Sequence, residues 1–210
     1  MRKIVVLIGL LFGFNAAALA DSPLTSTEFY AVYEDVAEVV TAVGNQTLSE
    51  HLKSYLNSQG SPLEAKIAVV NAIGWVFEGK KDAEEFFKYL QKKRGYKNFD
   101  DFLAKADGEL LIIMAYLKAL DNYFTVDEAA KIAKRAKEKL PKSYTTNIIY
   151  ALILAQKEID GDWCKVYALP NSVRSDKTLN KDMRAEAADI IFEYIDGYAK
   201  YCKKDSLPAS

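Results

Sequence analysis

The sequence predicts an all-α protein of about nine or ten helices, stacked as antiparallel hairpins and without a sheet. Apolar residues recur every three or four positions, as they do on one face of an amphipathic helix. No segment alternates convincingly with period two, and no Asp-Gly pair lies between two β-rich runs. Four Ser or Thr residues also precede a Glu by three positions, which is the pattern of a helix capping box. They are Thr25 with Glu28, Thr47 with Glu50, Ser61 with Glu64, and Thr125 with Glu128.

Three apolar stripes predict amphipathic outer helices. The first stripe ends at Gly44, the second at Gly95 and the third at Pro141, and both residue types end helices readily. The stripes are Phe29, Val32, Val36, Val40 and Val43; Ala83, Phe86, Phe87 and Leu90; and Ala129, Ile132, Ala133, Ala136 and Leu140.

Two segments that are apolar on nearly every side predict buried central helices. They are LLIIMAYLKAL at residues 110–120 and IIYALILA at residues 148–155. Because periodicity alone does not separate such runs from buried strands, the prediction rests on their length, on their Ala and Met content, and on caps at Asp107 and Ser143. A third apolar helix is expected over residues 62–77, with its tryptophan packed in the core.

The first 20 residues have the three-part layout of a secretory signal peptide. Arg2 and Lys3 carry positive charge, an apolar run covers residues 4–14, and small residues stand at Ala18 and Ala20. The apolar run is shorter than the roughly 20 residues that a spanning helix needs. We therefore expect cleavage after Ala20, no membrane anchor after cleavage, and an exported protein that is periplasmic or extracellular.

The mature chain has the size of one helical domain, expected over residues 21–202, with a flexible tail at residues 203–210. Lysine and arginine number 28 and aspartate and glutamate 29. The net charge is therefore close to zero and does not attract nucleic acid, so no nucleic-acid partner is expected.

The two cysteines, Cys164 and Cys202, predict a structural disulfide. Cys202 falls on the apolar face of a last helix expected over residues 181–202, and Cys164 lies in a short helix capped by Asp160 or Asp162. Two inward-facing cysteines in an exported chain favour a bridge, which would stabilise by about 4 kcal/mol by closing a loop of about 37 residues. A redox-active or metal-binding pair is the alternative, but the C-x-x-C spacing is absent.

The sequence lacks the motifs of metal, nucleotide and cofactor chemistry. His51 is the one histidine, whereas a transition-metal site draws on several ligands of this kind. The phosphate-binding patterns G-x-x-x-x-G-K-[ST] and G-x-G-x-x-G are absent. The fragment EIDGDW resembles the start of a calcium loop, but Asn171 stands where a bidentate glutamate is needed. We expect no catalytic residues, no metal and no cofactor.

Grouped carboxylates keep one enzymatic alternative open, because a glycan hydrolase requires little more than two acids. Most of these groups lie at helix starts or on charged faces, where capping and solvation already explain them. They are Glu34 with Asp35, Asp82 with Glu84 and Glu85, Asp100 with Asp101, and Glu158 with Asp160 and Asp162.

Tyrosines at helical spacing form the candidate interaction surface. Tyr30 and Tyr33 lie on the first predicted helix, and Tyr194, Tyr198 and Tyr201 lie on the last. Such a stripe is typical of packing against the core, but exposed rings also anchor protein partners and stack on sugars.

The segment DEAAKIAKRAKEKLP resembles the second helix of a tetratricopeptide repeat. Ala129, Ala136 and Pro141 match that family's small, small and proline positions, and Ala151 matches the small position of the next helix. Ala133 departs from the family, which usually has an aromatic residue there. The resemblance spans residues 110–156 and implies stacked helix pairs with a groove for a peptide or protein.

These observations predict an exported, non-enzymatic protein that binds a protein or peptide partner. Two alternatives remain: a carboxylate-dependent hydrolase acting on envelope glycan, and a carrier of small apolar ligands with an enclosed cavity.

Overall fold

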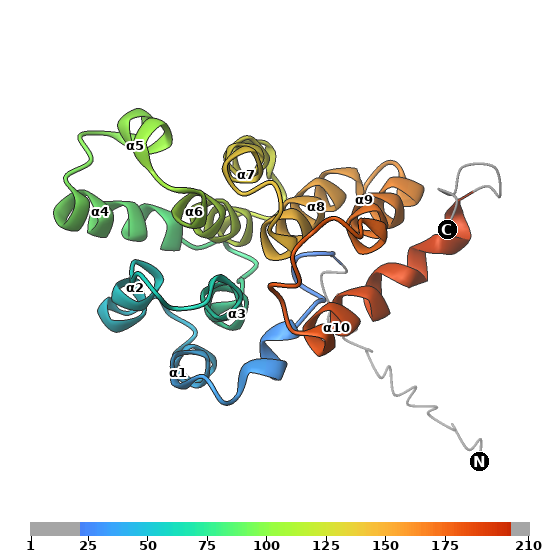
Figure 1. Ribbon diagram of the computed structural model, residues 1–210, viewed down its shortest axis with the longest axis horizontal. Coiled ribbons are helices and arrows are strands. Elements are labelled where there is room, and N and C mark those ends of the chain that lie inside the picture. The colour runs from blue at the N-terminus through green and yellow to red at the C-terminus, as the bar shows by residue number, and fades with distance from the viewer. Residues whose placement is uncertain (1–21, 203–210) are drawn as a thin grey trace, which may run out of the picture.

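The computed structural model describes residues 22–202, and in this part of the chain the protein is all-helical, as predicted (Figure 1). The signal peptide predicted for residues 1–20 and the tail predicted for residues 203–210 lie outside the described residues. The described chain contains ten α-helices and two 3-10 helices, η1 and η2. Their bounds are η1 Phe29–Tyr33, α1 Ala37–Asn45, α2 Glu50–Leu56, α3 Leu63–Ile73, α4 Asp82–Arg94, α5 Phe99–Lys105, α6 Gly108–Asp121, α7 Asp127–Lys139, α8 Tyr144–Glu158, α9 Trp163–Ser175, α10 Ala185–Ile195 and η2 Asp196–Tyr201.

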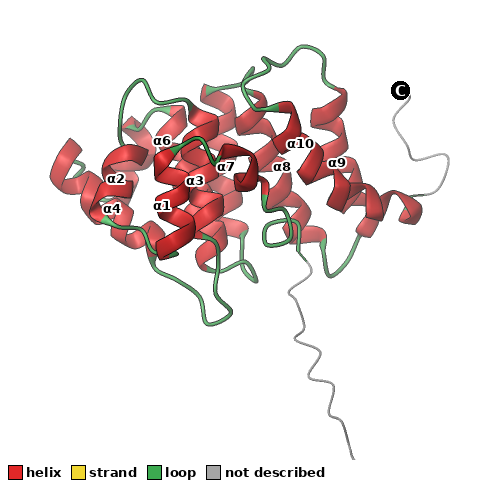
Figure 2. Cartoon of the chain, turned by 90° about the horizontal axis from the view of Figure 1, so that it is seen from below, coloured by secondary structure: helices red, strands yellow, loops and turns green. Residues whose placement is uncertain are grey.

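The helices lie in two layers. Helices α4, α6, α7, α8 and α9 follow one another in one layer, and α1, α2, α3 and α10 lie below them in the view of Figure 1. Figure 2 shows that many of these helices run alongside one another. Consecutive helices from α6 to α9 pack against each other, and α3 joins the layers by contacting α6 and α8. The short connections between these helices favour this antiparallel stacking.

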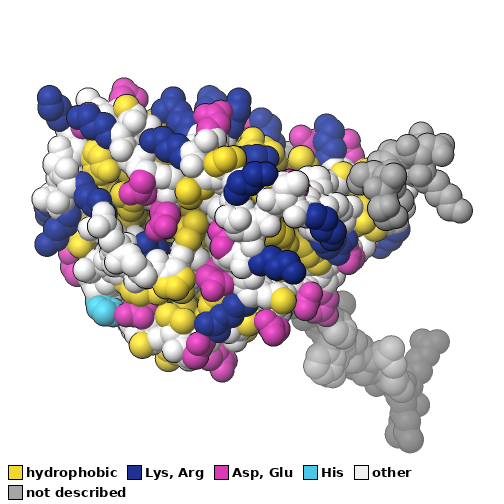
Figure 3. Space-filling model, viewed as in Figure 1, with side chains coloured by type: hydrophobic (Ala, Val, Ile, Leu, Met, Phe, Trp, Pro, Cys, Tyr) yellow, Lys and Arg dark blue, Asp and Glu magenta, His cyan; other side chains and the backbone are white. Residues whose placement is uncertain are grey.

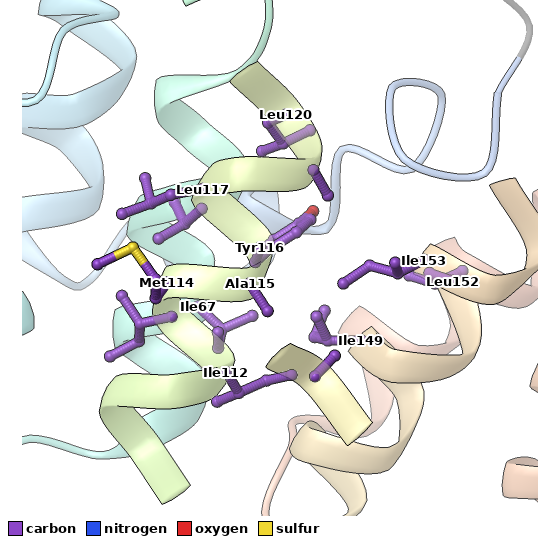
Figure 4. Close-up of a cluster of buried hydrophobic side chains, with 14 of the residues drawn as sticks. Ile67, Ile112, Met114, Ala115, Tyr116, Leu117, Leu120, Ile149, Leu152 and Ile153 are labelled. Atoms are coloured by element: carbon purple, nitrogen blue, oxygen red, sulfur yellow. The ribbon is translucent and has the colours of Figure 1, made fainter. Parts of the chain in front are cut away.

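The core is centred on α6 and α8, which are buried along most of their length. Figure 4 shows Ile112 and Ala115 of α6 facing Ile149 of α8, with Ile67 of α3 on another side of α6. A helix that is apolar all round is stable in water only when neighbours cover every face. The prediction of two buried central helices is therefore confirmed.

Side-chain caps begin several helices where the sequence predicted them. Asp107, Ser143 and Asp162 each accept a hydrogen bond from the backbone N–H three residues later, at the starts of α6, α8 and α9. The capping-box pairs locate helix starts less accurately. In α2 the cap is Ser49 rather than Thr47, and α7 begins after Val126 without a side-chain cap.

The stripe predicted to form one helix up to Gly44 is divided between two helices, so that prediction is wrong. The chain bends between η1 and α1, and Val40 and Val43 are exposed. Phe29 and Tyr33 are buried, in a 3-10 helix that packs against α3 and α10. The tertiary contacts of η1 have overridden the helical periodicity.

The predicted final helix also differs from the observed one. Helix α10 begins at Ala185 instead of residue 181 and ends at Ile195, after which the chain continues as η2. Gly197 follows this end and is a poor α-helix former, which favours the change in helix type there. The third apolar helix is shorter than expected as well, because α3 ends before Gly74, whose φ is +67°.

Candidate functional site

The two cysteines form the predicted disulfide. The sulfur atoms of Cys164 in α9 and Cys202 after η2 lie 2.06 Å apart, and their α-carbons lie 4.7 Å apart. The bridge ties the C-terminal segment to α9, next to Trp163. The predicted pairing is therefore confirmed, and neither thiol is free to ligate a metal.

An aromatic cluster surrounds this disulfide and includes three of the predicted interaction residues. Trp163 and Tyr201 are exposed, with ring centroids 4.5 Å apart. Tyr198 lies against both rings, and its hydroxyl is 2.8 Å from that of Tyr194. The rings of Tyr194 and Tyr198 are half-buried, so this cluster is both part of the packing and part of the surface.

The tyrosines predicted near the N-terminus do not join that cluster. Tyr33 is fully buried, its hydroxyl lies 3.0 Å from Oε2 of Glu64, and Arg184 stacks on its ring. Tyr30 is half-buried, and its backbone N–H donates to the side chain of Asn71. Tyr33 therefore belongs to the core, as aromatic stripes on helices usually do, and is not part of a binding surface.

A second aromatic surface, which the sequence did not predict, lies on two loops. Phe77 follows α3 and is 69% exposed, and Phe124 follows α6 and is 64% exposed. Their rings meet edge to face with centroids 5.7 Å apart. Tyr123 lies beneath Phe124 at 4.2 Å and is only 5% exposed. We call Val76, Phe77, Tyr123 and Phe124 the aromatic ridge.

Asp121, the last residue of α6, holds the two loops of the ridge together. Its backbone carbonyl accepts a hydrogen bond from the N–H of Lys80 at 3.0 Å. Its carboxylate accepts from the backbone N–H groups of Asp82 at 3.0 Å and Ala83 at 2.8 Å, and so caps α4 from outside that helix. Burial raises the pKa of Asp121 to about 6, although these two hydrogen bonds act in the opposite direction.

Gly79 allows this close approach of the two loops. Its φ is +83°, which is in the left-handed region, and a Cβ atom there would lie 2.9 Å from the carbonyl oxygen of Asp121. The ridge is also supported from below, because Trp75 packs edge to face on Tyr123 at 5.0 Å. Two loops that are distant in sequence thus form one supported surface.

Open cavities lie beside the ridge. One of about 390 Å³ is bordered by the loop from Val76 to Lys81, and one of about 660 Å³ lies between Phe124 and the end of α8. A groove of about 920 Å³ follows α6 between α4 and α7, and Phe87, Phe99 and Met114 form its apolar part. Asp121 and Asn122 border both the groove and the 390 Å³ cavity, so these two spaces are neighbours.

The sequence contained a signal for the ridge. Phe77 precedes Glu78 and Gly79, and Phe124 lies in the turn DNYFTV. Large aromatic residues in polar, turn-forming segments have no helix face to bury them. Predicting a helix through to Phe77 concealed this signal, because the residue then continued the apolar stripe of α3.

Most of the carboxylates considered for hydrolysis lie in ion pairs. Hydrogen bonds from Arg184, Lys88 and Lys105 lower the pKa values of Asp35, Glu84 and Asp101 respectively. A general acid in a glycan hydrolase needs a raised pKa instead. Among the described residues, no group of three His, Cys, Asp or Glu side chains could hold a metal ion.

The face of the molecule in Figure 3 carries side chains of both signs. Figure 3 shows basic and acidic side chains spread over one face of the molecule, with hydrophobic side chains between them. His51 is exposed, and its Nε2 atom lies 3.7 Å from Glu38. None of the helices between residues 22 and 202 has the length and apolarity that crossing a membrane requires.

The chain matches no protein family model, and comparisons with curated proteins and with solved structures find no match either. The resemblance to tetratricopeptide repeats therefore stays a prediction, and the function has to be inferred from the geometry of the site.

Proposed function

We propose that this is an exported, non-enzymatic interaction protein, which binds an apolar segment of a protein partner on the aromatic ridge. The observation that carries the proposal is the exposure of Phe77 and Phe124 side by side, at 69% and 64%. Single exposed apolar residues are ordinary, but grouped exposed aromatic rings are typical of interaction sites.

The ridge has the physical properties of a binding hot spot. Aromatic side chains bury a large area with few rotatable bonds, and they are enriched among the residues that dominate binding energy. Asp121 and the buried Tyr123 fix the two loops before any partner arrives. Such preorganisation lowers the entropic cost of association.

A protein segment fits this surface better than the ligands of the two alternatives. A carrier needs an enclosed apolar cavity. The side chains of α6 and α8 instead pack against one another, and the cavities beside the ridge lie at the surface. A hydrolase needs a free acid with a raised pKa. Asp121 has the raised pKa, but each of its carboxylate oxygens accepts a hydrogen bond from the start of α4.

Two observations support export. The first 20 residues have the layout of a signal peptide, and disulfides such as Cys164–Cys202 persist mainly in oxidising compartments. We place the protein in the periplasm or outside the cell on these grounds.

Photocrosslinking in the native host tests the proposal. The photoreactive amino acid benzoylphenylalanine is placed at position 77, at position 124 or, as a control, at the exposed position of Lys177 between α9 and α10. We expect adducts of discrete mass from positions 77 and 124 but not from 177, and we expect Phe124→Ser to remove the adduct formed at 77. Absence of adducts from the ridge, or identical adducts from the control position, would contradict the proposal.

A further inference from the structure

The groove beside the ridge combines an apolar floor with lysine side chains on opposite walls. Phe87 of α4 and Phe99 of α5 pack edge to face at 5.2 Å and are half-buried. Lys81 lies just before α4 and Lys131 lies on α7, and both are exposed. Because α6 lies between these two helices (Figure 1), a chain following α6 would pass both lysines.

The acidic residues of the groove already have partners. Glu84 pairs with Lys88 at 2.7 Å, Glu128 pairs with Lys118 at 3.0 Å, and Asp127 pairs with Lys157. The carboxylate of Asp121 is occupied by the backbone N–H groups at the start of α4.

Two of the four lysines of the groove are also engaged. Lys80 pairs with Asp82 at 2.8 Å, and Lys118 pairs with Glu128. Within residues 22–202, neither Lys81 nor Lys131 forms an ion pair. They act on Glu84 and Asp127 only from farther away, since Lys88 and Lys157 are the main causes of the lowered pKa values of these two acids. The groove therefore has two positive charges that its own acids do not neutralise by contact.

We infer that the groove binds an acidic segment of the partner, in which Asp or Glu side chains alternate with apolar ones. The carboxylates would meet Lys81 and Lys131, and the apolar side chains would cover Phe87 and Phe99. This inference rests on the proposed function, because it takes the segment bound in the groove to continue the one bound on the ridge. The two surfaces are continuous, since Lys81 borders both the groove and the cavity beside Phe77.

Charge complementarity has a measurable consequence for such a complex. Exposed lysines attract carboxylates over about a Debye length, so the affinity should fall as salt is added. Contacts between apolar side chains and the ridge should not weaken in this way, because hydrophobic burial does not depend on charge.

Selection of random 12-residue peptides displayed on phage tests the inference, because it does not require the partner to be identified first. The mature protein is immobilised at low salt, and the enriched peptides are sequenced and resynthesised. Their dissociation constants are then measured by fluorescence anisotropy. Five proteins are compared: the wild type, the ridge variants Phe77→Ser and Phe124→Ser, the groove variant Lys81→Gln with Lys131→Gln, and the control variant Lys92→Gln with Lys134→Gln. The control removes the same number of charges, at exposed lysines of α4 and α7 that do not border the groove.

We expect enriched peptides with an excess of Asp and Glu beside aromatic or aliphatic residues. Their affinity should fall roughly tenfold in the groove variant and less than twofold in the control variant, and roughly tenfold between 50 mM and 500 mM salt. Peptides that need Phe77 and Phe124 but show no acidic excess, or that bind the groove variant normally, would overturn the inference and leave the proposed function standing. A selection that enriches nothing, or peptides indifferent to Phe77→Ser and Phe124→Ser, would overturn both.

Discussion

The carboxylate of Asp121, at the end of α6, accepts a hydrogen bond of 2.8 Å from the backbone N–H of Ala83 in the first turn of α4. A helix whose own N-cap residue, Lys81, makes no side-chain cap is thus capped by a residue from another helix. Because the carbonyl of Asp121 also binds Lys80, this one residue fixes the loop that carries Phe77 next to the loop that carries Phe124. The shape of the aromatic ridge therefore depends on Asp121.

The raised pKa of Asp121 predicts a pH-dependent effect of Asp121→Asn. Between its ordinary pKa of 3.8 and its folded value of about 6, the folded protein binds a proton that the unfolded chain does not. This contribution to the free energy of unfolding is complete below pH 4 and is lost as the pH rises through 6. The free energy of unfolding of the wild type minus that of Asp121→Asn should fall by about 1 to 2 kcal/mol from pH 4 to pH 7, after allowance for partial exposure.

Urea unfolding at several pH values measures this difference. Asp101→Asn is the control, because a hydrogen bond from Lys105 lowers the pKa of Asp101. The contribution of the Asp101 carboxylate to the free energy of unfolding is present above the unfolded pKa and is lost as the pH falls below 4. The free energy of unfolding of the wild type minus that of Asp101→Asn should therefore stay flat from pH 4 to pH 7. A flat result for Asp121→Asn would show that its carboxyl titrates normally.

Substitutions of the two adjacent aromatic residues Tyr123 and Phe124 should differ in their effect on stability. Phe124→Ser removes an exposed ring, so the free energy of unfolding should change by less than about 1 kcal/mol. Tyr123→Ala removes a buried ring that contacts Trp75, and should cost about 3 kcal/mol. Chemical denaturation of both variants measures the contrast, and equal losses would mean that Phe124 is a packing residue.

Gly79→Ala should destabilise the protein more than Gly60→Ala does. Both glycines have a positive φ, +83° and +93°, so alanine is strained at either position by about 1 kcal/mol. At Gly79 the added Cβ would also lie 2.9 Å from the carbonyl oxygen of Asp121, whereas nothing lies within 4 Å at Gly60. The melting temperature of Gly79→Ala should therefore be several degrees lower than that of Gly60→Ala. Equal melting temperatures would mean that the loop of Gly79 does not approach Asp121 so closely.

The ion pair between the buried Lys66 of α3 and the partly exposed Glu109 of α6 predicts an asymmetry between two substitutions. Lys66 is 2% exposed, and its Nζ lies 2.8 Å from Glu109 and 2.7 Å from the carbonyl of Ser58. Glu109→Gln leaves the ammonium group buried without its counter-ion and should cost roughly 3 kcal/mol. Lys66→Met should cost less, because Glu109 is 44% exposed and remains solvated. Urea unfolding of both variants measures the two losses of stability. A larger loss for Lys66→Met than for Glu109→Gln would contradict the prediction.

Loss of the disulfide should weaken the C-terminal segment. In the chain-entropy model, Cys164→Ser with Cys202→Ser costs about 4 kcal/mol, because the unfolded chain regains the freedom of the closed loop. Denaturant unfolding of the wild type with a reducing agent serves as the control and should give the same loss. A loss below about 1 kcal/mol would contradict the chain-entropy account of this bridge.

Helices whose environment is uniform could be predicted from the sequence. Helix α6 is apolar on nearly every side and starts at a predicted aspartate cap, so a buried position suits it. The disulfide was predictable as well, since a chain with two cysteines offers one intramolecular pairing. The candidate binding surface was not predicted. Phe77 and Phe124 form it, whereas the predicted Tyr198 and Tyr201 lie in the cluster near the bridge and Tyr33 is buried.

The sequence by itself determined the helical class, the central helices and the partner of each cysteine. Helix periodicity and capping depend on residues close together in the chain, and two cysteines allow only one intramolecular pairing. Only the tertiary structure decided that η1 separates from α1 and that Phe77 and Phe124 meet at the surface. These features depend on contacts between segments far apart in the chain, such as Asp121 with the start of α4. Local patterns carry no information about which distant backbone groups will need a partner.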